Sequence, residues 1–345
     1  MNKLNLFQKT AIATLLATIF LIFVGGLVRA TGAGLGCPDW PMCWGKWWPP
    51  SSVGEIPVTA EPDPEKGPYY EGHRIDTLED GTTVHRRHYV SDYNKAKLWT
   101  EYANRLIGVL IGLFIIATFL LSFRYLKTKP KIVLGSFAAL VMVLFQGWLG
   151  GMVVRSGLKP GMITVHMIVA ILLMCLLLWV TFSAMENRLR SPLSGKQGKK
   201  IALAAVVLFV VTVIQVIIGS QVREALHDVE HAAATTLARS EWIDQVGLLD
   251  HIHRLFSWTV LLCGGFLFWK LCVKAAETKA SAALKKTSAV ILVLIVLQIV
   301  YGVALAYFGL PPAFQILHLG FASVMICAEF LLVLMTWGRT EKTST

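Results

Sequence analysis

The sequence predicts an all-α integral membrane protein whose eight transmembrane helices form two pseudo-symmetric four-helix bundles. Its composition, the spacing of its apolar windows and an internal repeat predict this fold. Hydrophobic residues make up 55% of the 345 residues and charged residues only 15%, and the mean hydropathy is +0.61. Because the charges are clustered, they leave uncharged windows near the length of about 20 apolar residues that a helix needs to cross a bilayer.

Eight apolar windows qualify as transmembrane helices: 10–29, 100–123, 132–154, 161–184, 200–222, 251–273, 286–309 and 313–337. The first window could also be a signal peptide. We interpret it as a helix because it is long and seven further windows follow it. The eight helices account for most of the chain, which indicates one polytopic protein and not a soluble domain with an anchor.

Lysine and arginine gather in the segments that an even number of helices places on one side of the membrane. Examples are Lys3, Lys129, Arg190 and Lys279, whereas the connection around 224–250 on the other side is acidic. By the positive-inside rule, both termini are predicted to be cytoplasmic. The net charge of +11 therefore reports topology, and we expect no nucleic-acid partner.

An internal repeat divides the chain into two halves. Landmarks of the third and fourth helices recur 152 residues later: Gln146 with Gln298, Gly150 with Gly302, Pro160 with Pro312, and His166 with His318. "GGLVRA" likewise parallels "GSQVRE", and "EYANRL" parallels "DHIHRL". These matches align Arg29 with Arg223, Glu101 with Asp250, Asn104 with His253, and Arg105 with Arg254. The predicted units are an N-terminal bundle, a cytoplasmic linker and a C-terminal bundle, at 1–184, 185–200 and 201–345. The long outer loop 30–99 belongs to the first.

Three histidines lie in the first turns of even-numbered helices, at one depth below the outer surface: His166, His253 and His318. Ionisable side chains inside a span are expensive and usually functional. The alternative for any one of them is a hydrogen-bonded histidine near a helix end. Their recurrence at repeat-equivalent places favours function.

In the C-terminal half, His253 and His318 can face each other across the bundle. Two imidazoles above and below a macrocycle are a common arrangement for a membrane b-type haem, whereas zinc needs three or four protein ligands. Small residues such as Gly302 and Gly320 would let the ring approach the backbone. Arg223 and Arg254 could hold its propionates as anion clamps.

The N-terminal half has His166, but Asn104 stands where its repeat counterpart has a histidine. Asparagine is a poor iron ligand, so this pocket cannot copy the bis-imidazole arrangement. Glu101 lies one turn before Asn104. One strong axial ligand, an open face and a carboxylate suit chemistry, whereas a saturated bis-histidine iron suits electron transfer.

The outer loop contains a cysteine pair and several tryptophans. Cys37 and Cys43 in "CPDWPMC" favour a disulfide in an oxidising exterior, with a metal pair as the alternative. Trp44, Trp47 and Trp48 are typical of an interfacial belt or of a lid over the pocket. A docking surface for a delivery partner is the other interpretation of this extended loop, 46–97.

These residues resemble the haem A synthase family, membrane enzymes that convert haem O to haem A for terminal oxidases. The resemblance rests on "GGLVRATGAGLGCPDWPMCWG", "EYANRLIG", "TVHMIVA", "HIHRLFSW" and "QILHLGFA" and covers all eight helices. It implies that His253 and His318 are axial ligands of a haem b in the C-terminal half. It also implies that haem O binds near His166, with Glu101 as the essential carboxylate and a disulfide in the first outer loop.

By this resemblance, the C8 methyl group of haem O is oxidised to a formyl group through a hydroxymethyl intermediate. We expect Arg29 and Arg105, with their counterparts Arg223 and Arg254, to bind propionates. Asn104 departs from the family's usual histidine, so His166 binds alone, a loop histidine (His73, His85 or His88) substitutes, or Asn104 holds a water on the iron. A second outer cysteine pair, found in some members, is missing because residues 224–250 contain no cysteine.

The expected setting is the bacterial cytoplasmic (inner) membrane, with membrane lipid, haem O synthase (protohaem farnesyltransferase) and oxidase assembly factors as partners. A quinol is one candidate for the electron donor, and a homo-oligomer is left open. The rival interpretations are a membrane b-type cytochrome that only relays electrons and a transporter. Asn104 argues against the first, and the position of the polar residues at the outer mouth argues against the second.

Overall fold

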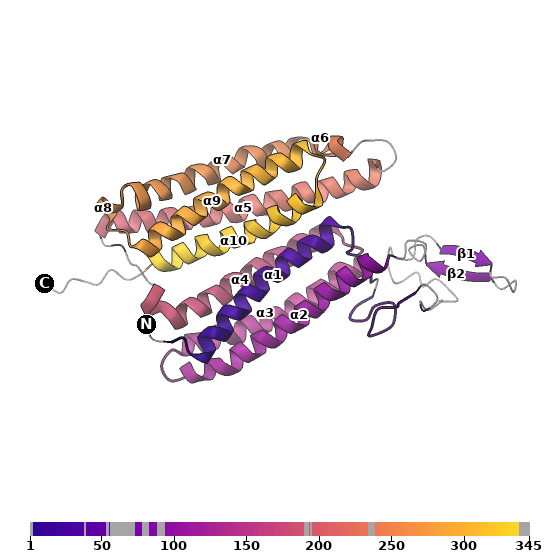
Figure 1. Ribbon diagram of the computed structural model, residues 1–345, viewed down its shortest axis with the longest axis horizontal. Helices are drawn as coiled ribbons and strands as arrows, with labels where there is room; N and C mark the ends of the chain where they lie inside the picture. Colours follow the sequence, from indigo (N-terminus) through magenta and orange to yellow (C-terminus); the bar gives the residue numbers. More distant parts are fainter. Residues whose placement is uncertain are drawn as a thin grey trace.

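The computed structural model describes residues 3–37, 39–52, 55, 73–77, 83–87, 94–189, 193, 195–233 and 239–337. Within these residues, eight helices are long and apolar enough to cross a membrane, as predicted. Their bounds are α1 Leu6–Ala30, α2 Lys95–Ser122, α3 Pro130–Arg155, α4 Pro160–Leu189, α5 Gly195–Ala233, α7 Leu248–Phe268, α9 Ala282–Tyr307 and α10 Pro312–Thr336. Figure 1 shows them in two groups, α1 to α4 and α5, α7, α9 and α10.

Short elements join the long helices. They are the 3₁₀ turns Phe123–Tyr125 and Arg239–Glu241, α6 Trp242–Val246, the π-helical turn Trp269–Val273, and α8 Ala275–Thr278. The outer loop contains an antiparallel hairpin of β1 His73–Thr77 and β2 Thr83–Arg87, which the sequence had not predicted. The membrane domain itself is all-helical, as expected.

Helix α5 is longer than its predicted span. The apolar window ends at 222, but the helix continues to Ala233, into the first part of what was expected to be an acidic loop. Hydropathy identifies only the part of a helix that lipid covers. Residues such as Glu, Ala and Leu continue a helix readily in water, so the element outlasts the window.

Within each group the helices pack in a ring. In the N-terminal half α1 contacts α2, α2 contacts α3, α3 contacts α4 and α4 contacts α1. The C-terminal half repeats this order with α5, α7, α9 and α10. The halves meet where α10 lies against α1 and α4, and Ile171 and Met174 of α4 share an apolar cluster there with Ile326 of α10. The start of α1 and the end of α10 lie at the same end of the molecule (Figure 1).

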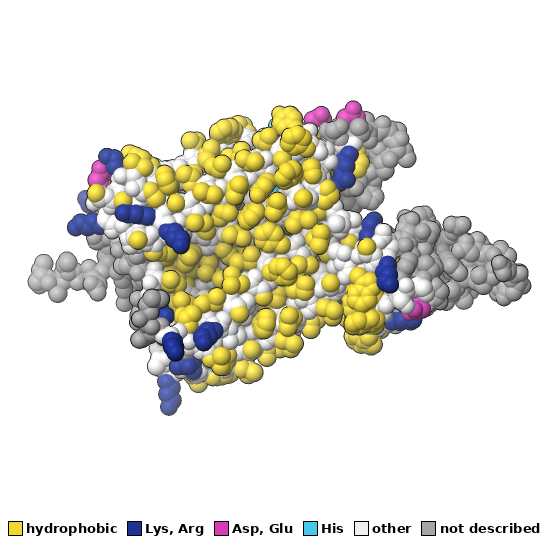
Figure 2. Space-filling view, viewed as in Figure 1, with side chains coloured by type: hydrophobic (Ala, Val, Ile, Leu, Met, Phe, Trp, Pro, Cys, Tyr) yellow, Lys and Arg dark blue, Asp and Glu magenta, His cyan; other side chains and the backbone are white. Residues whose placement is uncertain are grey.

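On the face shown in Figure 2, hydrophobic side chains form a band across both bundles, and Lys and Arg lie near its two ends. Such a belt is the surface that lipid chains require. The side of the membrane on which each end lies remains a prediction from the lysine and arginine pattern.

Gly320 belongs to the contact between the halves and not to a macrocycle pocket, which corrects an expectation. A Cβ at Gly320 of α10 would lie 2.1 Å from the ring of Phe23 in α1. Phe23 also packs edge-on against Phe321, with 5.7 Å between ring centroids. This close approach sets α1 directly beside the turn of α10 that carries His318.

Candidate functional site

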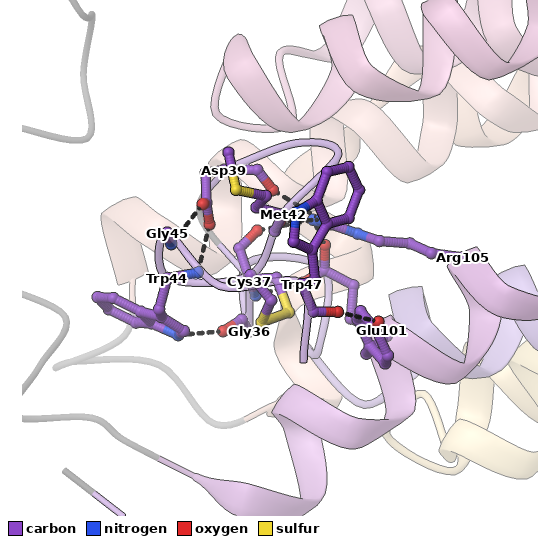
Figure 3. The surroundings of a disulfide bond; sticks show 11 residues. Gly36, Cys37, Asp39, Met42, Trp44, Gly45, Trp47, Glu101 and Arg105 are labelled. Atoms are coloured by element: carbon purple, nitrogen blue, oxygen red, sulfur yellow. Dashed lines mark hydrogen bonds and ion pairs between the residues drawn. A yellow bond between two sulfur atoms is a disulfide. The ribbon is translucent and has the colours of Figure 1, made fainter. Parts of the chain in front are cut away.

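The first outer loop is closed by a disulfide between Cys37 and Cys43, which confirms the predicted pair and sets aside the metal alternative. The Asp39 carboxylate lies inside this loop and accepts the N–H groups of Trp44 and Gly45, at 2.5 and 2.7 Å (Figure 3). The indole Nε1 of Trp44 donates to the carbonyl of Gly36 at 2.9 Å. The disulfide loop, residues 36–45, is therefore an internally bonded unit.

An ion pair on α2 anchors the disulfide loop. Arg105 Nη1 donates to the carbonyls of Asp39 and Met42, at 2.6 and 2.8 Å, and Nη2 donates to that of Cys37 at 2.8 Å. Nη2 also pairs with Glu101, whose other oxygen accepts the N–H of Cys37 at 2.7 Å. Glu101 is only 3% exposed. These two residues are neighbours on one helix face, and the loop makes them a buried structural pair and not a solvated bridge at a helix end.

The tryptophans of the loop have different environments. Trp44 is buried with the disulfide, Leu98 and Tyr102, so the interfacial belt interpretation is wrong for this residue. Trp47 and Trp48 are 71% and 62% exposed, as a belt requires. The sequence could not separate them because burial of Trp44 depends on the fold of the loop.

The disulfide loop is seated on the N-terminal bundle. A Cβ at Gly36 would lie 2.8 Å from the Cα of Leu98 in α2, so the two backbones touch. The ring of Trp40 packs in the same way on Gly151 of α3, with 2.8 Å from a Cβ there to the indole. The neighbouring residue Gly150 faces His166. The loop therefore covers the end of the N-terminal half at which α2 begins and α3 ends, which favours the lid interpretation.

Four repeat-equivalent side chains, two in each half, each face a glycine of the adjacent helix. A Cβ on the glycine would lie 3.9 Å from Asn104 Oδ1, and 3.5, 2.8 and 3.7 Å from the Cε1 atoms of His166, His253 and His318. The glycines are Gly25, Gly150, Gly219 and Gly302, respectively. Each of the four side chains has a buried polar atom without a hydrogen-bond partner among the described residues, namely Asn104 Oδ1 and the three Nδ1 atoms.

His253 and His318 lie together, with 6.5 Å between their ring centroids and 76° between the ring planes. One metal ion bonded to both rings, at about 2 Å from each nitrogen, requires a separation of this order. A haem iron brings its own four equatorial nitrogens, so two protein ligands complete it. The unpartnered ring nitrogens and the glycine-lined walls fit such a group.

The described part of the chain gives Asn104 no histidine substitute. His73 and His85 lie on β1 and β2, but their side chains are outside the described residues, as is all of His88. Asn104 keeps a buried amide oxygen without a partner on the wall where the other half has His253.

Two glutamines in contact with the histidines had no role in the sequence-based prediction. Gln146 donates through Nε2 to the carbonyl of His166, and Gln215 donates in the same way to His253, both at 2.9 Å. The sequence signal was present, because each glutamine precedes one of the facing glycines by four residues. Gln146 and its match Gln298 served there only as landmarks of the repeat.

The predicted propionate-binding arginines have different surroundings. The amino groups of Arg105 are used on the loop, whereas Arg254 is 39% exposed and pairs with Asp250 at 2.6 Å. Arg29 and Arg223, on α1 and α5, lie within electrostatic range of each other, with Glu224 close by. This group sits where the two halves meet.

Glu224 links the halves and was not predicted. It is buried and accepts a hydrogen bond from Thr164 of α4, two residues before His166. Thr164 also lies 3.2 Å from the hydroxyl of Ser220 and accepts from Gln221 at 3.1 Å. The helix turn that carries His166 is thereby tied to α5.

The arrangement of the chain agrees with one family of proteins. The family model for cytochrome oxidase assembly protein (COX15-CtaA) matches residues 8–330, which span all eight membrane helices. The chain belongs to this family. Like its bacterial relatives, it is a multi-pass protein of the inner membrane, and the family functions in oxidase assembly.

Curated relatives carry one name. The chain is 23% identical to the heme A synthase of Shewanella oneidensis, over 96% of this chain and 97% of that protein. It is 26% identical to the heme A synthase of Flavobacterium johnsoniae over the same shares. A third, from Nitrosomonas eutropha, is 25% identical over 89% of this chain and 87% of the relative.

Proposed function

We propose that this protein is a haem A synthase, which oxidises the C8 methyl group of haem O to a formyl group through a hydroxymethyl intermediate. The observation that carries the proposal is the set of four repeat-equivalent side chains, three histidines and one asparagine, each facing a glycine. One half offers two imidazoles and the other offers one. Duplicated pockets that differ in one ligand suit a pair of haems with different tasks.

In this proposal the C-terminal half holds haem b between His253 and His318, and the N-terminal half binds haem O at His166. Haem b, when bound, supplies one-electron transfer. His166 would hold and orient the substrate, and Asn104, in place of a second imidazole, would offer an amide that can hold a water. Because Thr164 ties the His166 turn to α5, the two halves keep a defined separation.

In this proposal the disulfide loop covers the substrate pocket. Trp40 and the anchored residues around Cys37 cover the outer ends of α2 and α3 and exclude water from the reacting methyl group. Glu101 is the carboxylate on which conversion depends. Its contacts with Cys37 and Arg105 also give it the structural role of holding this loop in place. We assign the propionates to Arg29, Arg223 and Arg254, although Arg254 also pairs with Asp250. Arg105 instead bonds three carbonyls of the disulfide loop.

Several partners follow from this role. Haem O synthase supplies the substrate, and oxidase assembly factors receive the product. Electrons come from a donor in the membrane, for which a quinol is the proposed class.

Co-expression with a haem O synthase tests the proposal. Mass analysis of extracted haem is expected to find haem A with the wild-type protein and only haem O with Glu101→Ala. If wild type leaves haem O unchanged while showing a normal bis-imidazole spectrum, the protein is a membrane cytochrome and not a synthase.

Gly219→Ala is expected to strip haem b from the C-terminal half. The new Cβ would lie 2.8 Å from Cε1 of His253, closer than a side chain tolerates, so the ring must move. The measurement is haem b per protein, from the reduced-minus-oxidised spectrum.

Gly265→Ala in α7 is the control for this loss, because a Cβ there meets nothing within 4 Å. It should retain haem b, and alanine should stabilise its helix by up to about 1 kcal/mol. Wild-type haem content in Gly219→Ala would contradict the placement of the macrocycle beside His253.

A further inference from the structure

Three of the four helices that carry the facing glycines also carry a glutamine one turn earlier. The pairs are Gln146 with Gly150 on α3, Gln215 with Gly219 on α5, and Gln298 with Gly302 on α9. In α1 the equivalent of the glutamine is Leu21, before Gly25. Residues four apart lie on one face of a helix, so each glutamine addresses the same neighbouring helix as its glycine.

Two of these glutamines bond to the backbone of a histidine itself. The carbonyl of a residue inside a helix already accepts the N–H four residues later, and its second lone pair remains available. Gln146 Nε2 occupies that place at His166, and Gln215 Nε2 at His253, both at 2.9 Å. Gln146 Nε2 also lies 3.3 Å from the ring nitrogen Nε2 of His166.

Glutamine and glycine together hold the histidine at two points. The amide fixes the main chain of the histidine turn. The glycine one turn further on leaves room for the ring, because a Cβ at that glycine would lie 3.5 Å from Cε1 of His166 and 2.8 Å from Cε1 of His253. A ligating imidazole depends on such supporting contacts for its orientation.

The other two pairs of glycine and facing side chain, Gly302 with His318 and Gly25 with Asn104, lack the hydrogen bond from a glutamine. Gln298 Nε2 is buried without a hydrogen-bond partner among the described residues, so this amide does not donate to the carbonyl of His318. At the α1–α2 corner, Leu21 replaces the glutamine where Asn104 replaces the histidine. Glutamine and histidine are thus lost together at one corner, as expected if the glutamine serves the histidine.

We propose that Gln146 and Gln215 are positioning residues for the axial histidines, Gln146 for His166 and Gln215 for His253. This inference rests on the proposed haem sites. In the C-terminal half it makes the ligands unequal, since His253 is held by an amide and His318 is not. In the N-terminal half it makes Gln146 necessary for productive binding of haem O, although it does not ligate.

Gln215→Met tests the C-terminal arm, because methionine has nearly the length of glutamine but no donor. We expect haem b content per protein to fall on the order of tenfold, or the low-spin ferric signal in electron paramagnetic resonance to shift. Gln298→Met is the matched control in the same half. It removes an amide nitrogen that has no partner, so haem b should stay at the wild-type level.

Gln146→Met tests the N-terminal arm. Haem b should be unchanged, while absorbance titration with haem O should show affinity weaker by on the order of tenfold, together with less haem A. If a methionine variant does not accumulate, Gln146→Leu or Gln215→Leu is measured in its place, since leucine also lacks a donor.

The inference for His253 is overturned if Gln215→Met and Gln298→Met have the same haem b content and the same low-spin ferric signal. Haem O binding at wild-type affinity in Gln146→Met would overturn it for His166. A wild-type protein that makes no haem A but binds haem b defeats the proposed function alone, because the Gln215 arm can still be measured.

Discussion

His253→Ala and His318→Ala are each expected to abolish stably bound haem b. His166→Ala is expected to leave that haem in place but to stop the formation of haem A. In the C-terminal half both rings are needed, because the 6.5 Å between their centroids leaves room for one iron bonded to both imidazoles. Loss of either leaves one axial bond, and such a haem dissociates on purification.

His166 should behave differently because it lies in the other bundle. Its ring contacts Gly150 of α3, and its carbonyl is bonded to Gln146 of the same helix. Haem b content from the absorbance spectrum and haem A from mass analysis separate the two effects. If His166→Ala also removes haem b, the assignment of separate tasks to the two halves is wrong.

Arg105→Met is expected to release the disulfide loop and to stop haem A formation. The substitution removes donors to three loop carbonyls and leaves the buried Glu101 carboxylate without its countercharge. Breaking a buried ion pair by removing one partner costs about 3–5 kcal/mol. Amide hydrogen exchange over residues 36–45 is the direct measurement, and the Cys37 N–H bonded to Glu101 should lose its protection.

Lys46→Met, directly after the disulfide loop, provides the matched control. Lys46 pairs with Glu55 at 3.4 Å, but both side chains are more than 40% exposed, so this bridge is worth about 0–1 kcal/mol. It should leave exchange and conversion unchanged. If Arg105→Met stops conversion while the loop stays protected, Arg105 acts on the substrate and not as an anchor.

Much of the fold could be predicted from the sequence because lipid imposes its demand on each residue of a span. The eight windows became eight helices, and the repeat placed Asn104, His166, His253 and His318 at equivalent positions. What hydropathy cannot see is structure beyond the membrane. The continuation of α5 to Ala233 and the β1–β2 hairpin were both missed for this reason.

The site was predictable in its residue types but not in its contacts. Glu101 was predicted as the essential carboxylate and Arg105 as a propionate ligand. Only the folded loop reveals that Arg105 pairs with Glu101 and holds the carbonyls of Asp39 and Met42. Gly320 was predicted to leave room for a macrocycle, but in the structure the ring of Phe23 packs against it. In both cases the partner comes from a segment distant in sequence.

The sequence by itself determined the eight spans, the duplication and the histidine that is missing at Asn104. Each of these depends on local composition or on internal comparison, and a bilayer leaves little freedom in either. The tertiary structure alone decided which polar group satisfies which: Arg105 on the disulfide loop, Thr164 on Glu224, and the glutamines on the histidines. Those pairings arise when helices pack, since a buried polar atom must then find its partner on a neighbouring element.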